Sequence, residues 1–105
     1  MTGNPVIGTP VTVTVRYYVL FCIAAGYCRE EEFRLEPEPR MADLVEVICQ
    51  KYGDEFRHKI FSREGTLKST AWFILNGIKL AEDPLSTKLK NGDILILSSP
   101  LLVGG

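Results

Sequence analysis

The sequence predicts an α+β domain in which a mixed sheet of about five strands carries one main helix, in the order β-β-α-β-β-β. Three observations predict this class. Apolar and polar residues alternate near the start, one stretch has apolar residues at helical spacing, and the last third holds two Asn-Gly turn signals between short apolar runs. At 105 residues the chain is long enough for one hydrophobic core and too short for two.

The first two strands are expected to form an antiparallel hairpin. Residues 11–16 alternate between apolar and polar side chains, and residues 17–23 are wholly apolar, so we expect one strand to continue to residue 23. A second strand is predicted over residues 28–35, with Phe33 and Leu35 facing inward.

The main helix is predicted to follow a strand break formed by two prolines. Apolar residues recur at i, i+3, i+4, i+7 and i+11 from Met41, which describes one stripe on a helix ending at Tyr52. Gly53 is suited to close it in a left-handed conformation. For residues 54–62 we expect a short helix or an irregular turn.

A second hairpin is predicted in the last third of the chain. Residues 71–75 are strongly β-forming, and Asn76-Gly77 is the dipeptide most typical of a two-residue turn into residues 78–80. Asp83 begins a one-turn segment.

The last strand is expected over residues 93–98, after the Asn91-Gly92 turn. Its aliphatic side chains fall on both faces, so we expect it inside the sheet. Because the first and last strands are both predicted to lie inside the sheet, we expect them to pair in parallel. This is the β-grasp arrangement. The chain then divides into a flexible arm (1–10), the β-grasp domain (11–98) and a flexible tail (99–105).

Composition argues for a protein partner. Twelve Lys and Arg residues and thirteen Asp and Glu residues give a net charge of −1. The composition therefore lacks the excess of positive charge that is typical of direct nucleic-acid binding. We expect no metal site, since no Cys lies at ligand spacing from His58, the only histidine. The three cysteines are interpreted as reduced thiols of a cytoplasmic protein. The longest apolar run, residues 17–28, is too short to span a membrane.

The sequence ends with Gly104-Gly105. At the average glycine usage of about 7%, two glycines would end roughly 0.5% of chains by chance. Glycine has no Cβ, so such an end fits a narrow channel and brings its carboxylate close to the reagents of another enzyme. The alternatives are a frayed terminus or a cloning scar.

Several short motifs of the last thirty residues together resemble the C-terminal signature of the ThiS/MoaD family of ubiquitin-like sulfur carriers. They occur in the family's order and at similar spacing. They are Asn76-Gly77, Asp83-Pro84-Leu85, the stretch 89–93, the aliphatic strand 94–97, and Pro100 followed by Val103-Gly104-Gly105.

The resemblance implies chemistry at the end of the chain. An adenylating enzyme of the ubiquitin-activating type, ThiF/MoeB-like, would use ATP to adenylate the carboxylate of Gly105, which then becomes a thiocarboxylate or an amide with a lysine. Gly104 would allow close backbone approach. The chain would itself bind no cofactor and would be a carrier, not an enzyme; it shows no catalytic triad.

Two groups of apolar residues are candidates for partner binding. Leu101, Leu102 and Val103 would hold the tail in place, or else continue the last strand into the core. Trp72 and Phe73 would belong to an apolar patch on the sheet that the activating enzyme covers, or else to the core.

Three functions remain open at this point. The first is a sulfur carrier that serves a synthase for molybdopterin or thiamine, or a tRNA thiolase; one version of it is the small subunit of a molybdopterin-synthase-like complex. The second is a modifier attached to lysines of target proteins. The third is a β-grasp interaction domain without chemistry at Gly105.

Overall fold

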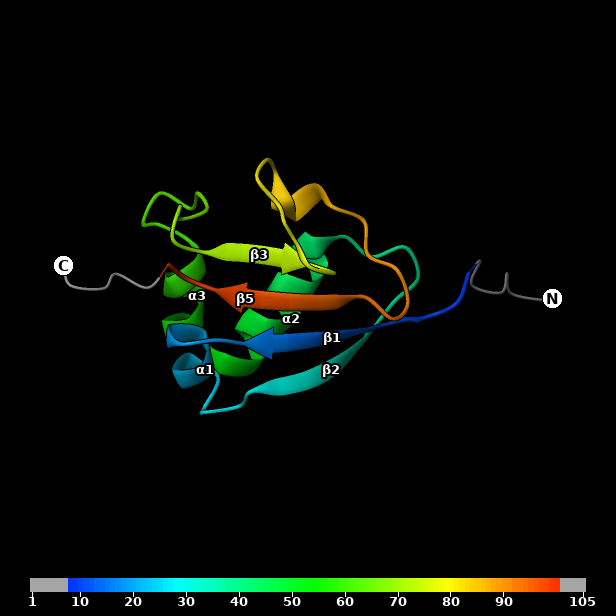
Figure 1. Ribbon diagram of the computed structural model, residues 1–105, viewed down its shortest axis with the longest axis horizontal. Helices are drawn as coiled ribbons and strands as arrows, with labels where there is room; N and C mark the ends of the chain where they lie inside the picture. Colours follow the sequence, from blue (N-terminus) through cyan, green and yellow to red (C-terminus); the bar gives the residue numbers. More distant parts are fainter. Residues whose placement is uncertain (1–7, 101–105) are drawn as a thin grey trace.

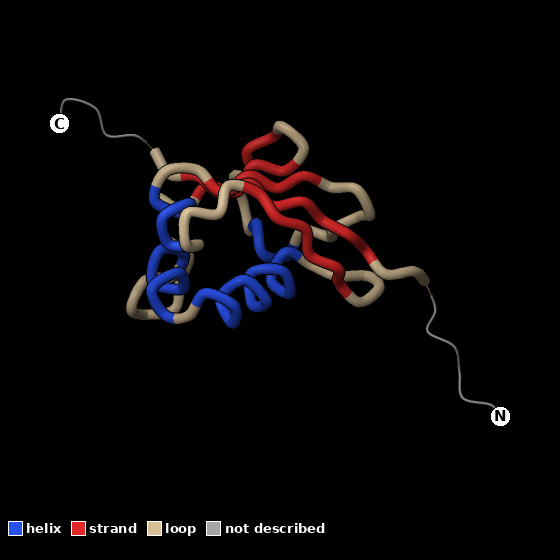
Figure 2. The backbone as a smooth tube through the Cα atoms, turned by 90° about the horizontal axis from the view of Figure 1, so that it is seen from below, coloured by secondary structure: helices blue, strands red, loops and turns tan. Residues whose placement is uncertain are grey.

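The computed structural model describes residues 8–100, so the predicted arm and tail lie mostly outside the described residues. A five-stranded sheet forms one layer, and helices cover one of its faces (Figures 1 and 2). The strands are β1 (Val11–Tyr17), β2 (Glu30–Leu35), β3 (Trp72–Leu75), β4 (Ile78–Lys79) and β5 (Ile94–Ser98). The helices are α1 (Leu20–Ala24), α2 (Met41–Tyr52), α3 (Asp54–Ile60) and the 3₁₀ turn η1 (Pro84–Ser86).

The sheet has the strand order β2-β1-β5-β3-β4. β1 pairs antiparallel with β2 and parallel with β5, and β5 pairs antiparallel with β3. The predicted parallel pairing of the first and last strands is therefore confirmed. The α+β, β-grasp fold class is confirmed with it.

The core lies between the inner face of the sheet and the apolar stripe of α2. β1 and β5 contribute every second residue, β2 contributes Phe33 and Leu35, and β3 contributes Phe73. The buried residues of α2 follow the predicted helical spacing. The central members, all fully buried, are Val13, Val15, Leu95 and Leu97 from the sheet and Met41, Leu44 and Ile48 from α2.

Helix α2 has the predicted bounds. Its first turn is capped where the carboxylate of Asp43 accepts a 2.8 Å hydrogen bond from the backbone N–H of Arg40. Gly53 ends the helix at φ 89°, and its N–H donates to the carbonyl of Cys49. The segment that follows is the helix α3, which buries Phe56 and Ile60.

The first strand is shorter than predicted. β1 ends at Tyr17, the chain turns at Val19, and α1 takes up most of the remaining apolar run. The N–H of Tyr18 still donates to the carbonyl of Leu97, but β5 ends one residue later. A longer strand would have had no partner there. A continuous apolar run fits a buried helix as well as a strand, which is why the pattern alone was misleading.

The last strand is interior in the sheet, but only one of its faces is fully buried. Leu95 and Leu97 point into the core, whereas Ile94 and Ile96 are partly exposed on the opposite face. The expectation that neither face of β5 meets solvent is therefore corrected.

We expect Leu95→Ala to lower the free energy of unfolding by about 2–5 kcal/mol, because it leaves a cavity in the core. Ile96→Ala should cost clearly less, since its side chain already meets solvent. Urea unfolding followed by circular dichroism would compare the two variants. Equal losses would contradict the assignment of a single buried face.

Candidate functional site

The candidate site is the end of the sheet where β5 delivers the C-terminal segment. β5 lies between β1 and β3, and its last pairings are Leu97 with Tyr17 and Ser98 with Trp72. Ser99 and Pro100 then pass beside α1 (Figure 1). The segment that follows thus starts from a strand held on both sides.

The Asn91-Gly92 turn fixes the start of β5 against β1. The side-chain oxygen of Asn91 accepts a 2.8 Å hydrogen bond from the N–H of Thr12. The N–H of Gly92, at φ 90°, donates to the carbonyl of Thr12. Here a glycine permits the positive φ and leaves the backbone free to pair.

Asp93 joins both Asn-Gly turns. Its buried carboxylate accepts hydrogen bonds from the side-chain amide of Asn76 at 2.9 Å and from the N–H of Lys90 at 2.7 Å. The side-chain oxygen of Asn76 in turn accepts from the N–H of Ile94 at 2.9 Å. Asn76 and Gly77 both have positive φ, as the predicted two-residue hairpin requires. The motifs that carried the resemblance therefore hold β5 in register.

An apolar group lies on the face of the sheet opposite the helices. We call Trp72, Ile74, Ile94 and Ile96 the outer sheet face; all four are partly exposed. Ile74 pairs directly with Ile96. The ammonium of Lys79 lies 4.0 Å from the centroid of the Trp72 ring, a cation–π contact that covers part of the ring.

The structure separates the two aromatic residues predicted to bind a partner. Trp72 lies on the outer sheet face, but Phe73 is 1% exposed and belongs to the core. This corrects the expectation for Phe73, because adjacent residues of a strand point to opposite faces. Ile74, Ile94 and Ile96 were missed; the two-residue period shared by 72, 74, 94 and 96 is the signal that could have found them. The other predicted site residues, Leu101, Leu102, Val103, Gly104 and Gly105, lie outside the described residues.

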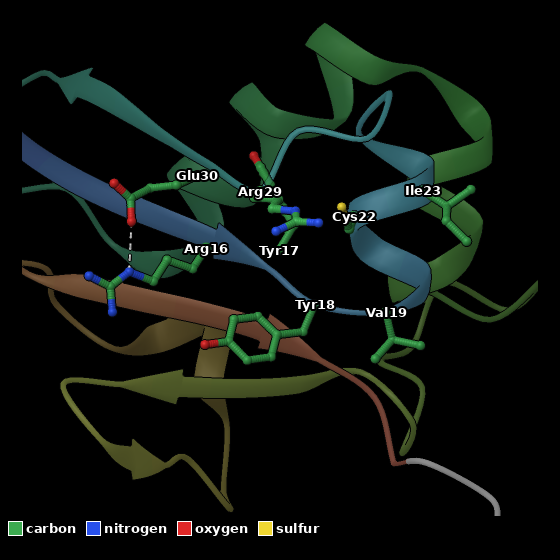
Figure 3. A pocket seen from close by; sticks show the side chains of 8 residues that line it. All are labelled: Arg16, Tyr17, Tyr18, Val19, Cys22, Ile23, Arg29 and Glu30. Atoms are coloured by element: carbon green, nitrogen blue, oxygen red, sulfur yellow. Dashed lines mark hydrogen bonds and ion pairs between the residues drawn. The ribbon is translucent and has the colours of Figure 1, made fainter.

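A second feature of this end is a cavity of about 510 Å³ beside α1 (Figure 3). Within it the guanidinium of Arg16 pairs with the carboxylate of Glu30 at 2.8 Å. The cavity is lined by Arg16, Tyr17, Tyr18, Val19, Cys22, Ile23, Arg29 and Glu30.

The carboxylate of Glu31 connects β1, β2 and α2. It accepts hydrogen bonds from the hydroxyls of Tyr17 at 2.6 Å and Tyr52 at 2.5 Å, and from the ammonium of Lys51 at 2.5 Å. Partial burial opposes ionisation of Glu31, but these three donors outweigh it and lower its pKa. Burial, followed by the bond to Glu31, raises the pKa of both tyrosines. The carboxylate is therefore charged and the tyrosines are neutral near neutral pH.

The three cysteines are free thiols. Cys49 is buried, and burial raises its pKa, whereas Cys22 and Cys28 are partly exposed. Among residues 8–100, His, Cys, Asp and Glu nowhere gather in a group of three that could hold a metal ion. No helix in the same range has the length and apolarity needed to cross a membrane.

Comparison with known proteins shows relatives of this fold among solved structures. A putative molybdopterin converting factor, subunit 1, from Pyrococcus furiosus is 26% identical, with a TM-score of 0.69 over 87% of this chain and 99% of that chain. SAMP1 from Haloferax volcanii is 18% identical, with a TM-score of 0.76 over 89% of this chain and 99% of that one. Urm1 from Trypanosoma brucei is 17% identical, with a TM-score of 0.69 over 93% and 100%. No protein-family model and no curated protein matches the chain.

These neighbours are ubiquitin-like β-grasp proteins of the sulfur-carrier and modifier type. The resemblance inferred from the last thirty residues is thereby confirmed. The fold of this chain is therefore the ubiquitin-like β-grasp, and the chain is similar to small proteins of this carrier and modifier type.

We expect the stability of the protein to fall in acid partly through Glu31. Because its pKa in the folded state lies below the ordinary 4.5, its contribution is fully present above that pH and is lost as the pH falls through the folded-state pKa. Glu31→Gln should lower stability at neutral pH and flatten this acid dependence. Urea unfolding between about pH 3 and 7 measures both effects. Glu32→Gln, on the same strand but exposed, is the control, and an equal change in it would contradict the assignment.

Proposed function

We propose that this chain is a ubiquitin-like sulfur carrier whose C-terminal glycine, Gly105, is adenylated and then converted to a thiocarboxylate. One observation carries the proposal: the central strand of a β-grasp sheet ends next to an open apolar face and leads into a segment that finishes in Gly-Gly. A rigid strand presents such a segment to another enzyme in a defined direction. The proposal requires a free carboxylate on Gly105.

The chemistry needs an activated acyl group. A carboxylate is a poor acyl donor because its leaving group would be oxide. Attack of the Gly105 carboxylate on the α-phosphorus of ATP forms an acyl-adenylate and releases pyrophosphate. Hydrosulfide from a sulfur source then attacks the carbonyl carbon and displaces AMP, and the product is the thiocarboxylate.

Each partner has a separate role in this scheme. The adenylating enzyme binds ATP, while the chain supplies the acceptor carboxylate and binds no cofactor itself. Gly104 leaves room for the backbone near the nucleotide. Leu101, Leu102 and Val103 hold the segment in the channel, and the outer sheet face, with Trp72 at its edge, docks against the enzyme.

Protein modification is the second candidate function. SAMP1 from Haloferax volcanii, an archaeal modifier by name, has a TM-score of 0.76 to this chain. In this case the amine of a target lysine attacks the same acyl group and forms an amide. For the sulfur carrier, the neighbour titled as a molybdopterin converting factor favours molybdopterin as the destination, ahead of thiamine or a thiolated tRNA base.

We expect the purified chain, incubated with ATP, its adenylating enzyme and a sulfur source, to gain the mass of one oxygen-to-sulfur exchange on its C-terminal peptide. Deletion of Gly105 should abolish the product because the acceptor carboxylate is displaced. Intact-mass and peptide mass spectrometry measure both.

Circular dichroism is the control that the Gly105 deletion still folds, as expected for a change well beyond the end of β5 at Ser98. Branched Gly-Gly remnants on lysines of other proteins would support the modifier instead. If deletion of Gly105 left both products unchanged, the proposed chemistry would be wrong.

The outer sheet face should determine affinity for the adenylating enzyme. In ATP–pyrophosphate exchange, we expect Ile96→Asp to raise the KM for the chain about tenfold or more, because it places a charge in an apolar contact. A tenfold change corresponds to about 1.4 kcal/mol of binding free energy. Ile78→Asp is the matched control, since Ile78 is exposed on β4 and pairs with Leu75, away from this group. Equal KM values for folded variants would argue against docking through this face.

A further inference from the structure

Exposed apolar side chains are concentrated around α1. Tyr18 is 48% exposed, Val19 43%, Leu20 47%, Ile23 50% and Tyr27 75%. We call these five residues the α1 surface. Elsewhere in residues 8–100, the only large apolar side chains with comparable exposure are those of Val47 and Ile78. Three of them, Tyr18, Val19 and Ile23, line the same cavity, and exposed apolar side chains gathered on a small domain are typical of an interaction site.

The backbone is strained at the residue before α1 and at the third residue after it. Val19 has φ 54° and ψ −117°, and Tyr27 has φ 66°. Positive φ is a clear outlier for a β-branched residue and unfavourable for any residue with a Cβ. Glycine would adopt both conformations without this cost. Tyr27 is 75% exposed, so burial of its side chain does little to offset this strain. Strain of this kind clusters at functional sites.

The α1 surface borders the exit of the C-terminal segment. A cavity of about 250 Å³ is lined by Leu20 and Phe21 of α1 together with Ser99 and Pro100, which follow β5. Figures 1 and 2 both place α1 at the end of the sheet where β5 finishes. A protein that takes up this segment therefore meets α1 as well as the outer sheet face.

Cations surround the α1 surface. Lys59 and Lys68 line the smaller cavity, and no carboxylate lines it. Arg29 lines the larger cavity, whose one carboxylate, on Glu30, already pairs with Arg16. The net charge of the whole chain is −1, so this cationic rim is local to this end.

We infer that the α1 surface is a second docking site, for the protein that takes up the C-terminal segment, and that this partner presents an apolar groove edged by carboxylates. The inference rests on the proposed function, because it needs a partner that receives Gly105. Apolar contacts to the α1 surface supply affinity, and ion pairs with Arg29, Lys59 and Lys68 orient the partner at the exit. A second copy of the chain fits less well, since a symmetric contact through this surface would bring the same cations together.

The test measures binding separately from chemistry. A chain lacking Gly104 and Gly105 is titrated with the adenylating enzyme by calorimetry, so that no acyl transfer interferes. We expect Val19→Gly and Tyr27→Gly each to weaken binding at least about tenfold while thermal stability is unchanged or higher, since both remove strain. Val47→Ala, an exposed apolar residue on α2, is the control that should leave affinity unchanged.

Charge reversal tests the acidic edge of the partner. Lys59→Glu combined with Lys68→Glu should weaken binding and make it less sensitive to salt, because two attractive charges become repulsive. Arg63→Glu, an exposed cation that lines neither of the two cavities beside α1, is the matched control.

Several outcomes would overturn the inference. The inference would be wrong if the glycine variants kept their affinity, or if the truncated chain without substitutions did not bind the adenylating enzyme. Thiocarboxylate formation by the full chain is measured separately, and it shows whether the proposed function stands. Loss of stability alongside affinity would assign α1 a structural role only. Dimerisation abolished by Tyr27→Gly would identify a second copy as the occupant. Shifts of the Ile23 and Tyr27 amide resonances on removal of residues 101–105 would identify the chain's own segment.

Discussion

The parallel pairing of β1 with β5 is the constraint on which the rest of the structure depends. It places the last strand in the centre of the sheet, brings Leu97 beside Tyr17, and ends β5 next to the start of α1. The Asn91 and Gly92 contacts to Thr12 fix where this pairing begins. If the register shifted by one residue, the leucines of β5 would face outward and the isoleucines inward, and both the core and the candidate docking face would be lost.

The two faces of the sheet differ in burial. The inner face and α2 bury the residues that hold the fold together, whereas the outer face keeps an apolar group partly open to solvent. Asp93 and Asn76 connect both Asn-Gly turns to β5, so the open face is built on a rigid frame. The α1 surface adds a third region at the same end of the molecule. In the proposed function, a partner would therefore contact surfaces on both sides of the point where β5 ends.

Much of the fold was predictable because its signals are local. The stripe from Met41 to Tyr52 has one period, and Asn76-Gly77 requires one kind of turn. The helix α1 was not predictable, because an apolar run without polar interruptions has no period, and only the end of β5 decides where β1 stops. Strand alternation separates Trp72 from Phe73, but which of the two side chains faces the core depends on the pairing of β3 with β5, which is a long-range contact. The strain at Val19 and Tyr27 has no sequence signature apart from the neighbouring Gly26.

The position of Trp72 has a practical consequence for observing the protein at work. It is the single tryptophan of the chain, so all indole fluorescence comes from the outer sheet face. Its ring is already in contact with the ammonium of Lys79, whose displacement would alter the electric field at the indole. A protein that covers this face would change both hydration and field at one chromophore. The unlabelled protein therefore contains its own optical reporter of whether the outer sheet face is covered.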